Sequence, residues 1–260
     1  MNKFIKDIRK YWKYTVYAAK SDLKSEVSAS YLNWLWWILD PLLFMLVYVF
    51  IALIVFQRGE QYFPIYVFIG LTTWNFFNKT VNKSVKIIKS NSSIVSKVYI
   101  PKFILIIQRE LVNGFKMLVS FLLIFVMMLI YRVPLSWKIL YTIPLVLLVA
   151  IVTFGVGSIL SHFGVFFDDL NNIVTVLLKL VFYMSGVFYS IADRVPEPFN
   201  QLLLKLNPVA FAMDELRGCL LYNRTPDWMI VVTWIVVGIL LSAIGVRTIY
   251  KYENSYVKVI

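Results

Sequence analysis

The sequence predicts an all-α integral membrane protein with six transmembrane helices. Of its 260 residues, 60% are apolar and 15% are charged, whereas typical soluble proteins have about 45–50% and about 25%. Six mostly apolar windows of about 20 residues, the length that crosses a bilayer, alternate with polar segments. The 26 Lys and Arg residues exceed the 14 Asp and Glu residues and gather on one side of these windows.

The composition also excludes several classes of site. A single cysteine (Cys219) and a single histidine (His162) allow neither an intrachain disulfide nor a Cys/His zinc site. The sequence G-x-x-x-x-G-K-[S/T] of a phosphate-binding loop does not occur, so we expect no nucleotide, cofactor, metal or catalytic site in this chain. The net charge of +12 would suggest nucleic acid in a soluble protein, but in a membrane protein it reports orientation.

Residues 1–30 predict an amphipathic helix. Apolar or small residues recur at spacings of three and four along one face, and lysines occupy the other face. The stripe consists of Phe4, Ile8, Tyr11, Thr15 and Ala19. Such a helix lies in the membrane interface with its lysines near anionic headgroups. It is either a surface anchor alone or also a contact for a cytoplasmic partner.

We expect residues 1–260 to form one membrane domain, with helices one to five within residues 32–191. The apolar windows are 32–56, 63–81, 103–131, 139–163, 173–191 and 228–249. One side carries seven, five and three basic residues in the N-terminal arm, the loop after the second window and the tail. The opposite loops carry one, two and four. The excess predicts that both termini are cytoplasmic.

The loop from 84 to 102 predicts a short cytoplasmic helix. Residues 90–93 read Ser-Asn-Ser-Ser, which breaks one helix and can cap the next. We expect the new helix over 94–99, where Ile94, Val95, Val98 and Tyr99 form an apolar side before Pro101 ends it. This segment is either a docking element for a partner's groove or a solvated connector.

Residues 192–227 predict two short helices on the extracellular side, over 198–206 and 208–221. Asn207 followed by Pro208 is typical of an N-cap with proline at the first helical position. Both helices are apolar yet too short to cross a bilayer, which favours a re-entrant hairpin. A packed extracellular cap is the alternative. Residues 228–260 then hold the sixth helix and a cytoplasmic tail.

Four ionisable residues bear on chemistry. Asp40 precedes Pro41 within the first window, where charge is unfavourable, so we expect it to face a polar cavity or a partner helix. Asp168 and Asp169 form a carboxylate pair after the fourth window, which is either a metal or sugar-nucleotide site or, as we favour, a solvated turn. His162 has no catalytic partner at a usable spacing and is interpreted as structural.

Aromatic residues make up 17% of the chain and follow helical stripes. The first and fifth windows carry the candidate channel residues Trp34, Trp37, Phe44, Tyr48, Phe182, Tyr183 and Tyr189. Aromatic rings at membrane interfaces are ordinary anchors and packing elements. Stripes that run inward also suit the stacking of sugar rings, which is apolar and weakly directional.

The order of motifs resembles the permease subunit of type-2 ABC exporters for polysaccharides and polyol phosphates, such as O-antigen, capsule and teichoic acid. The similar stretches follow in chain order. They are Leu32-Asn33-Trp34-Leu35-Trp36, Asp40-Pro41-Leu42-Leu43, Gly70-Leu71, Trp74-Asn75-Phe76-Phe77, Lys97-Val98-Tyr99-Ile100-Pro101, Phe166-Phe167-Asp168-Asp169, Phe188-Tyr189 and Leu206-Asn207-Pro208. Each motif alone is weak, whereas their order and spacing together are specific.

The resemblance implies a homodimer bound to two copies of a separate ATPase, which would hold ATP and magnesium. It also implies a lipid-linked glycan substrate and a bacterial or archaeal plasma membrane. A coupling role carries over to the cytoplasmic loop, and an extracellular gate carries over to Asn207 and Pro208. The coupling residues are Ser92, Ile94, Val95, Lys97, Val98, Tyr99 and Pro101.

Two positions depart from the family's pattern. An arginine usually precedes the aspartate after the fourth helix, where this chain has Asp168, and a proline usually stands where this chain has Gly186. Three other functions stay open: export of a drug or another lipid by the same class of transporter, a membrane-embedded glycosyl- or lipid-modifying enzyme, and an ion-driven transporter. The enzyme would use Asp168 and Asp169.

Overall fold

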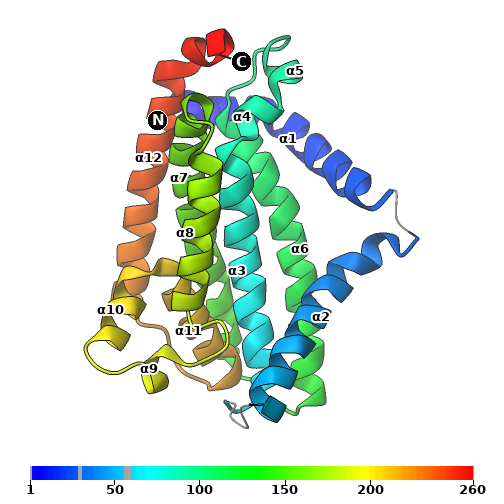
Figure 1. Ribbon diagram of the computed structural model, residues 1–260, viewed down its shortest axis with the longest axis vertical. Coiled ribbons are helices and arrows are strands. Elements are labelled where there is room, and N and C mark those ends of the chain that lie inside the picture. Colours follow the sequence, from blue (N-terminus) through cyan, green and yellow to red (C-terminus); the bar gives the residue numbers. More distant parts are fainter. Residues whose placement is uncertain (1, 29–30, 56–59, 260) are drawn as a thin grey trace.

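The computed structural model describes residues 2–28, 31–55 and 60–259, and within these ranges every regular element is a helix (Figure 1). Four of the described helices are long and apolar enough to cross a membrane: Trp36–Ile54, Phe103–Ile130, Trp137–Phe166 and Trp228–Tyr256. These correspond to the first, third, fourth and sixth apolar windows. The predicted class, an all-α multi-pass membrane protein, is therefore confirmed.

The helices form one bundle. The principal elements are α1 (Asn2–Ser28), α2 (Trp36–Phe50), α3 (Phe63–Val85), α4 (Ile87–Ser90), α5 (Ser92–Val95), α6 (Phe103–Ile130), α7 (Thr142–Phe166), α8 (Leu170–Met184), α9 (Ile191–Arg194), α10 (Phe199–Leu206), α11 (Pro208–Leu221) and α12 (Trp228–Val259). Short 3-10 or π segments are η1 (Asn33–Leu35), η2 (Ile51–Val55) and η3 (Trp137–Tyr141).

The described ends of α1 and α12 lie at the same end of the bundle, together with α4 and α5 (Figure 1). We call this the terminal end. The opposite end carries α9 and α10. The basic loop that contains α4 and α5 thus shares an end with the basic arm α1.

α3 lies at the centre of the bundle and contacts α2, α6, α7, α8 and α11. Most of its side chains are buried, among them Ile65, Val67 and Phe68. It is the second apolar window, extended as far as Val85. Its second half is more polar than the four spans named above because three asparagines and two lysines occur along it. A helix surrounded by protein can carry such groups, since they need not face lipid.

α7 and α12 form the most extensive helix pair, and small residues permit their close approach. A Cβ added at Gly155 would lie 2.8 Å from the Leu241 Cβ, and one added at Gly245 would lie 2.5 Å from the Ser158 Cβ. Both distances are shorter than side chains tolerate. The backbones can therefore pack at this separation only with glycine at these positions.

α8 is shorter than the sequence predicts. The fifth apolar window extends to residue 191, but the helix ends at Met184. Gly186 then adopts φ +64°, a left-handed conformation that glycine reaches without strain. Fifteen helical residues rise about 22 Å, less than the hydrocarbon thickness of about 30 Å. Apolarity alone did not reveal this turn, because Val187 and Ile191 remain buried beyond the end of the helix.

Candidate functional site

A stripe of polar residues runs along α3 between α2 and α8. Asn75, Asn78, Lys79 and Asn82 recur at spacings of three and four, and each is at least partly exposed. On one side, Asn82 Nδ2 donates a hydrogen bond to Thr175 Oγ1 of α8 over 3.0 Å. The stripe thus presents amide and ammonium groups along a helix whose other faces are buried.

On the other side of the stripe, Lys79 Nζ lies 3.6 Å from Asp40 Oδ2 of α2, and both side chains are about half exposed. The two residues line a cavity of about 80 Å³ between α2, α3 and α6, together with Asn75 and Trp37. The ion pair offsets the unfavourable placement of Asp40 within an apolar helix. It also joins α2 to the polar stripe of α3.

Aromatic side chains border the same face. Tyr48 of α2 stacks on Phe188, with ring centroids 3.7 Å apart and an interplanar angle of 23°. Phe182 of α8 lies 5.3 Å from Trp74 of α3 and 5.3 Å from Phe188. The structure thus brings two candidate channel residues, Tyr48 and Phe182, into one cluster with two rings that sequence reasoning did not select.

The other candidate aromatics lie apart from this cluster. Trp37 packs edge-on against Phe115 of α6, with centroids 5.6 Å apart. Tyr189 Oη donates to the Tyr183 carbonyl over 2.8 Å, and the Tyr183 side chain is exposed. Phe44 is also exposed on α2.

The predicted stripe of the first window is wrong at one position. Trp34 belongs to the 3-10 segment η1 and not to α2, so it does not continue the helical stripe from Trp37. A 3-10 segment has about 3.0 residues per turn in place of 3.6, which changes the direction of its side chains. Trp34 is exposed.

The outward faces of α2 and α8 are apolar and mostly exposed. Only 11% of the α2 span is buried, against 44% of the span that contains α7. The exposed residues of the two helices include Leu43, Phe44, Val47, Val176, Leu177 and Leu180. A membrane or a second protein chain must cover these faces, because exposed apolar patches of this size mark interaction surfaces.

The loop at the terminal end differs from the predicted helix over 94–99. The helix α5 begins at Ser92 and ends at Val95, residues 96–98 form a turn and a bend, and residues 99–101 are irregular up to and including the buried Pro101. Asn91 Nδ2 donates back to the Ile87 carbonyl over 2.8 Å, so its side chain serves the end of α4 in place of capping α5. Ser92 accepts through its carbonyl from the Ser96 hydroxyl.

One side of this loop is anchored and the other is open. Val95 and Ile100 are buried with Ile87 and Phe103 in a cluster at the terminal end. Ile94, Lys97, Val98 and Tyr99 are exposed. The predicted apolar side therefore divides, since Val95 packs inward whereas the other three apolar residues face outward.

Tyr99 and Lys102 tie the loop to the end of α12. Tyr99 Oη donates to Glu253 Oε2 and Lys102 Nζ donates to Glu253 Oε1, both over 3.1 Å. Loss of hydration, and then the negative charge of Glu253, raise the pKa of Tyr99 to about 12, so its hydroxyl keeps its proton. Tyr11 of α1 also donates to the Tyr99 carbonyl over 3.0 Å. Three distant segments thus meet at this loop.

Asp168 lies in the turn between α7 and α8 and pairs with α4. Lys89 Nζ lies 2.6 Å from Asp168 Oδ1. This hydrogen bond and the positive charge of Lys89 lower the pKa of Asp168. Asp168 and Asp169 lie in an exposed turn, which agrees with the favoured interpretation of this pair.

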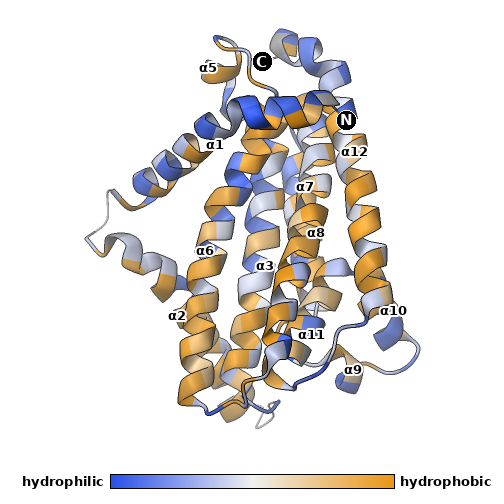
Figure 2. Ribbon diagram, turned by 180° about the vertical axis from the view of Figure 1, so that it is seen from behind, coloured by the Kyte–Doolittle hydropathy of each residue, from blue (hydrophilic) through white to orange (hydrophobic). Residues whose placement is uncertain are grey.

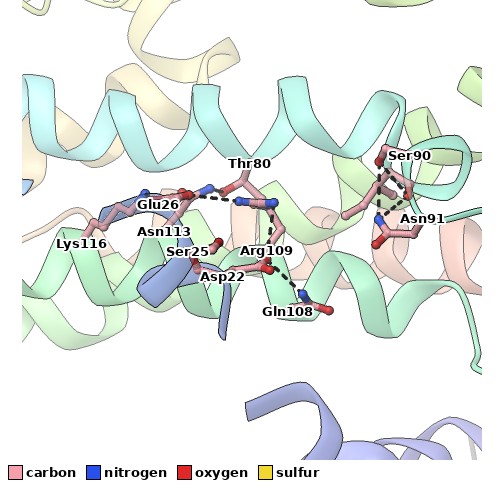
Figure 3. A network of polar contacts seen from close by, with 11 residues as sticks. Asp22, Ser25, Glu26, Thr80, Ser90, Asn91, Gln108, Arg109, Asn113 and Lys116 are labelled. Carbon is pink, nitrogen blue, oxygen red and sulfur yellow. Dashed lines mark hydrogen bonds and ion pairs between the residues drawn. The ribbon is translucent and has the colours of Figure 1, made fainter. Parts of the chain in front are cut away.

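α1 is fastened to α6 by a network of acidic and basic side chains (Figure 3). Arg109 lies 3.5 Å from Asp22 and 3.6 Å from Glu26, and Lys116 also pairs with Glu26. Gln108 Nε2 donates to Asp22 over 3.0 Å. Arg109 and Lys116 lie within the third apolar window, and both bind acidic residues of α1 that lie more than 80 positions away in sequence.

The predicted stripe of α1 packs inward. Phe4 lies 5.0 Å from Phe103 between ring centroids, and Thr15 and Ala19 are buried. Lysines at positions 6, 10 and 13 are exposed on the other face. The amphipathic helix is therefore confirmed, and it extends from the N-terminal arm as far as Ser28.

At the opposite end, Asn207 and Pro208 begin α11 as the sequence predicts. Asn207 Oδ1 accepts hydrogen bonds from the backbone N–H groups of Val209 and Ala210 over 3.1 and 3.2 Å. Its amide donates to Ser185 Oγ over 2.9 Å, which joins α11 to the end of α8. α10 and α11 occupy almost the predicted ranges.

Arg217 of α11 is the main residue that sequence reasoning missed. It is one of the four basic residues counted in residues 192–227, and its side chain is buried at 3% exposure. It donates to the carbonyls of Tyr66, Gly186 and Val187 over 3.1, 2.9 and 2.8 Å. Its guanidinium also lies 3.6 Å from the centroid of the Tyr66 ring. No local pattern indicates a burial site built from three separate segments.

The polar stripe of α3 was also missed, although a signal for it exists. Asn75, Asn78, Lys79 and Asn82 have the spacing of one helical face and lie within or directly after the second apolar window. This polar periodicity is visible in the sequence, whereas isolated charges do not reveal it.

Comparison with known proteins identifies a common family. The family model described as "ABC-2 type transporter" matches residues 16–221. The O-antigen export system permease protein RfbA of Klebsiella pneumoniae is 26% identical over 246 residues, which cover 94% of each chain. RfbA of Myxococcus xanthus is 28% identical over 227 residues, 87% of each chain. The polysialic acid transport protein KpsM of Escherichia coli is 24% identical over 191 residues, 72% of each chain.

The family match runs from the middle of α1 to the end of α11 and includes the polar stripe of α3 and the loop around α5. The four helices that are long and apolar enough to cross a membrane agree with a family of membrane transporters. This chain belongs to the ABC-2 type transporter family.

Proposed function

We propose that this chain is the permease subunit of an ATP-driven exporter that moves a lipid-linked polysaccharide or teichoic-acid-like polymer out of the cytoplasm. The observation that carries the proposal is the polar stripe of α3, bordered by the rings of Tyr48 and Phe182. Amides bond sugar hydroxyls, and aromatic faces stack on the apolar faces of sugar rings. Similarity to permeases named for O-antigen export and polysialic acid transport supports the same substrate class.

The proposed topology has six crossings in a bacterial or archaeal plasma membrane: α2, α3, α6, α7, α12, and α8 together with the mostly buried residues 185–191 that continue it. The terminal end is cytoplasmic, because the basic residues of α1 and of the loop around α5 lie there. α10 and α11 then form a re-entrant hairpin at the extracellular end. Val209, Phe211 and Leu216 are buried in the apolar core, and α11 contacts both α3 and α7, which supports a hairpin inserted between the membrane helices over a cap packed on their ends.

A second copy of the chain completes the channel in this proposal. The apolar faces of α2 and α8 flank the polar stripe and are exposed in one chain. Apposition of two such faces would bury the apolar residues and enclose two polar stripes in one passage. A dimer is more favourable here than a lipid environment, because lipid would leave Lys79 and Asn78 without water or polar partners, whereas the dimer encloses them in a polar passage.

Two copies of a separate ABC ATPase, which hold ATP and magnesium, dock on the loop around α5. Ile94, Lys97, Val98 and Tyr99 offer an exposed apolar and basic surface. The buried side of the loop is tied to α12 through Lys102 and Glu253. A push on the exposed side therefore reaches α12 through these hydrogen bonds and reaches α6 through Phe103.

The extracellular gate is assigned to the junction of α8 and α11. Asn207 donates a hydrogen bond to Ser185, and Arg217 donates hydrogen bonds to the carbonyls of Gly186 and Val187, so α11 is linked to the turn that follows α8. A displacement of α8 would therefore either break these hydrogen bonds or move α11 with it. The left-handed Gly186 supplies the local freedom that the family's usual proline would restrict.

Reconstituted transport tests the proposal. The chain is placed in vesicles with its ATPase, and lipid-linked glycan is supplied on the ATPase side. The double variant Asn75→Leu/Asn78→Leu should lower export by at least about tenfold, because the glycan loses hydrogen-bond partners along the passage. Its thermal unfolding temperature should stay unchanged, since both side chains are only half-buried.

Thr233→Val on α12 is the matched control, because it also removes a polar group from an exposed position of a membrane-crossing helix. Its export should equal that of the unmodified chain. Full export by the double variant would refute a glycan passage along α3. Export that continues without ATP would refute the ATP-driven mechanism, and transport of a drug or simple lipid alone would shift the substrate class.

A further inference from the structure

A large apolar cavity lies under α1 at the terminal end. α1 crosses the ends of α6, α7 and α12 (Figure 2). The cavity between these four helices has a volume of about 930 Å³. Its walls include Phe4, Ile8, Ile107, Phe154, Ile239 and Val246. None of the described residues of α2 or α8 lines it, so it is separate from the α3 stripe.

Two cations and one carboxyl group interrupt the apolar walls. Lys3 lies over the ring of Tyr250, with its Nζ 4.5 Å from the ring centroid. Arg247 is exposed and makes no ion pair within residues 2–28, 31–55 and 60–259. Glu110 Oε1 is buried and has no hydrogen-bond partner in the same ranges. A buried polar atom without a partner is unfavourable, so a ligand that supplies one is favoured here.

These groups match the parts of one kind of molecule. The apolar walls accommodate an acyl chain, because the hydrophobic effect favours removing it from water. Lys3 and Arg247 attract a phosphate. Glu110 accepts a hydrogen bond from an ammonium group of the same headgroup. Glu110 stands seven residues into α6, about 10 Å from the start of the helix, which is the depth of the headgroup region beneath an interfacial helix.

We propose that this cavity binds a phospholipid whose headgroup carries a primary ammonium, such as phosphatidylethanolamine, from the leaflet at the terminal end. One acyl chain fills the space between α6, α7 and α12, and the headgroup lies under α1. The lipid joins α1 to α12 across a gap that their side chains do not fill. The carboxyl group of Glu110 favours a headgroup with an ammonium over one that carries only a phosphate, because the ammonium both donates a hydrogen bond and places a positive charge beside the carboxyl group.

Native mass spectrometry of the purified chain tests the proposal without any transport assay. The chain is equilibrated in nanodiscs of either phosphatidylethanolamine or phosphatidylcholine, released, and scored for retained lipid. Phosphatidylethanolamine should be retained at least about tenfold more than phosphatidylcholine, whose quaternary ammonium has no N–H to donate. Equal retention of the two lipids would overturn the assignment of the headgroup.

Two variants locate the site. Ala243→Trp fills the cavity, and Arg247→Ala removes a phosphate partner; each should lower retention of phosphatidylethanolamine by about tenfold. Leu240→Trp adds the same ring to an exposed position of α12 outside the cavity and should retain the lipid. Unchanged retention in Ala243→Trp would overturn the site. Should that variant not fold, Arg247→Ala decides, since its side chain is exposed.

Discussion

The pair α7 and α12 contrasts with the pair α2 and α8. α7 and α12 pack against each other along their lengths, with Gly155 and Gly245 at points where a side chain would collide. α2 and α8 instead border α3 and leave apolar faces exposed. The same residue types, leucine, valine and phenylalanine, therefore build a closed contact in one place and an open surface in the other.

The difference shows which residues distinguish a membrane helix that packs within its own chain from one that leaves a face open for a partner. Lipid is as apolar as a leucine side chain, so hydrophobicity does not distinguish a helix that packs in its own chain from one that awaits a partner. Small residues at close contacts, such as Gly155 and Gly245, and buried polar groups with all their hydrogen bonds, such as Arg217, mark the parts of the bundle that are closed within one chain. We call these parts the closed region. A partly exposed polar stripe beside apolar faces marks the open region.

The largest effect is expected for Arg217→Leu. Three carbonyls lose their donor, and each buried polar group left unsatisfied costs about 1–3 kcal/mol, so we expect a loss of at least about 3 kcal/mol of unfolding free energy. Thermal unfolding in detergent measures it. Arg224→Leu in the same hairpin is the control, because its ion pair with Asp214 is partly exposed. An equal shift of the unfolding temperature in both variants would contradict the assignment of Arg217 as a stabilising buried hydrogen-bond donor.

An intermediate effect is expected for Gly245→Ala. The added Cβ would lie 2.5 Å from the Ser158 Cβ, so α7 and α12 must separate at a cost of about 1–3 kcal/mol. Gly114→Ala is the control, since its nearest neighbour is a Phe76 ring atom at 3.8 Å. That variant should gain about 0.5–1 kcal/mol, because alanine favours a helix over glycine. Thermal unfolding should thus show opposite signs, and equal signs would contradict close packing at Gly245.

The smallest effect on stability is expected for Val98→Glu. Val98 is exposed, so the unfolding free energy should change by less than about 0.5 kcal/mol. ATP hydrolysis by the associated ATPase should nevertheless lose its coupling to export, because a charge enters the proposed docking surface. Val259→Glu places the same charge on another exposed valine and should keep coupling. Coupled export in Val98→Glu would place the ATPase contact elsewhere.

Local features were predictable from the sequence. The stripe of α1 and the start of α11 at Asn207 and Pro208 depend on neighbours three or four positions apart. Four of the apolar windows became long apolar helices because length and hydropathy alone set that requirement. The end of α8 was not predictable, since residues 185–191 remain apolar although Gly186 turns the chain.

The α5 loop shows why the candidate site was only partly predictable. Its composition predicted a short helix with an apolar side, yet Val95 packs inward while Val98 faces outward. That division depends on Glu253, which lies about 150 residues away and holds both Tyr99 and Lys102. Hydrogen bonds between distant segments leave no periodic signal in either segment.

The sequence by itself determined the membrane class, the apolar helices, the family resemblance and the helix starts, because these follow from composition and from residues close in the chain. Only the tertiary structure decided which charges are buried and which apolar faces remain open. Arg217 became an internal hydrogen-bond donor and Arg109 a partner of α1 because folding brought distant acceptors within reach. Burial and pairing are properties of the packed bundle, and no single helix contains them.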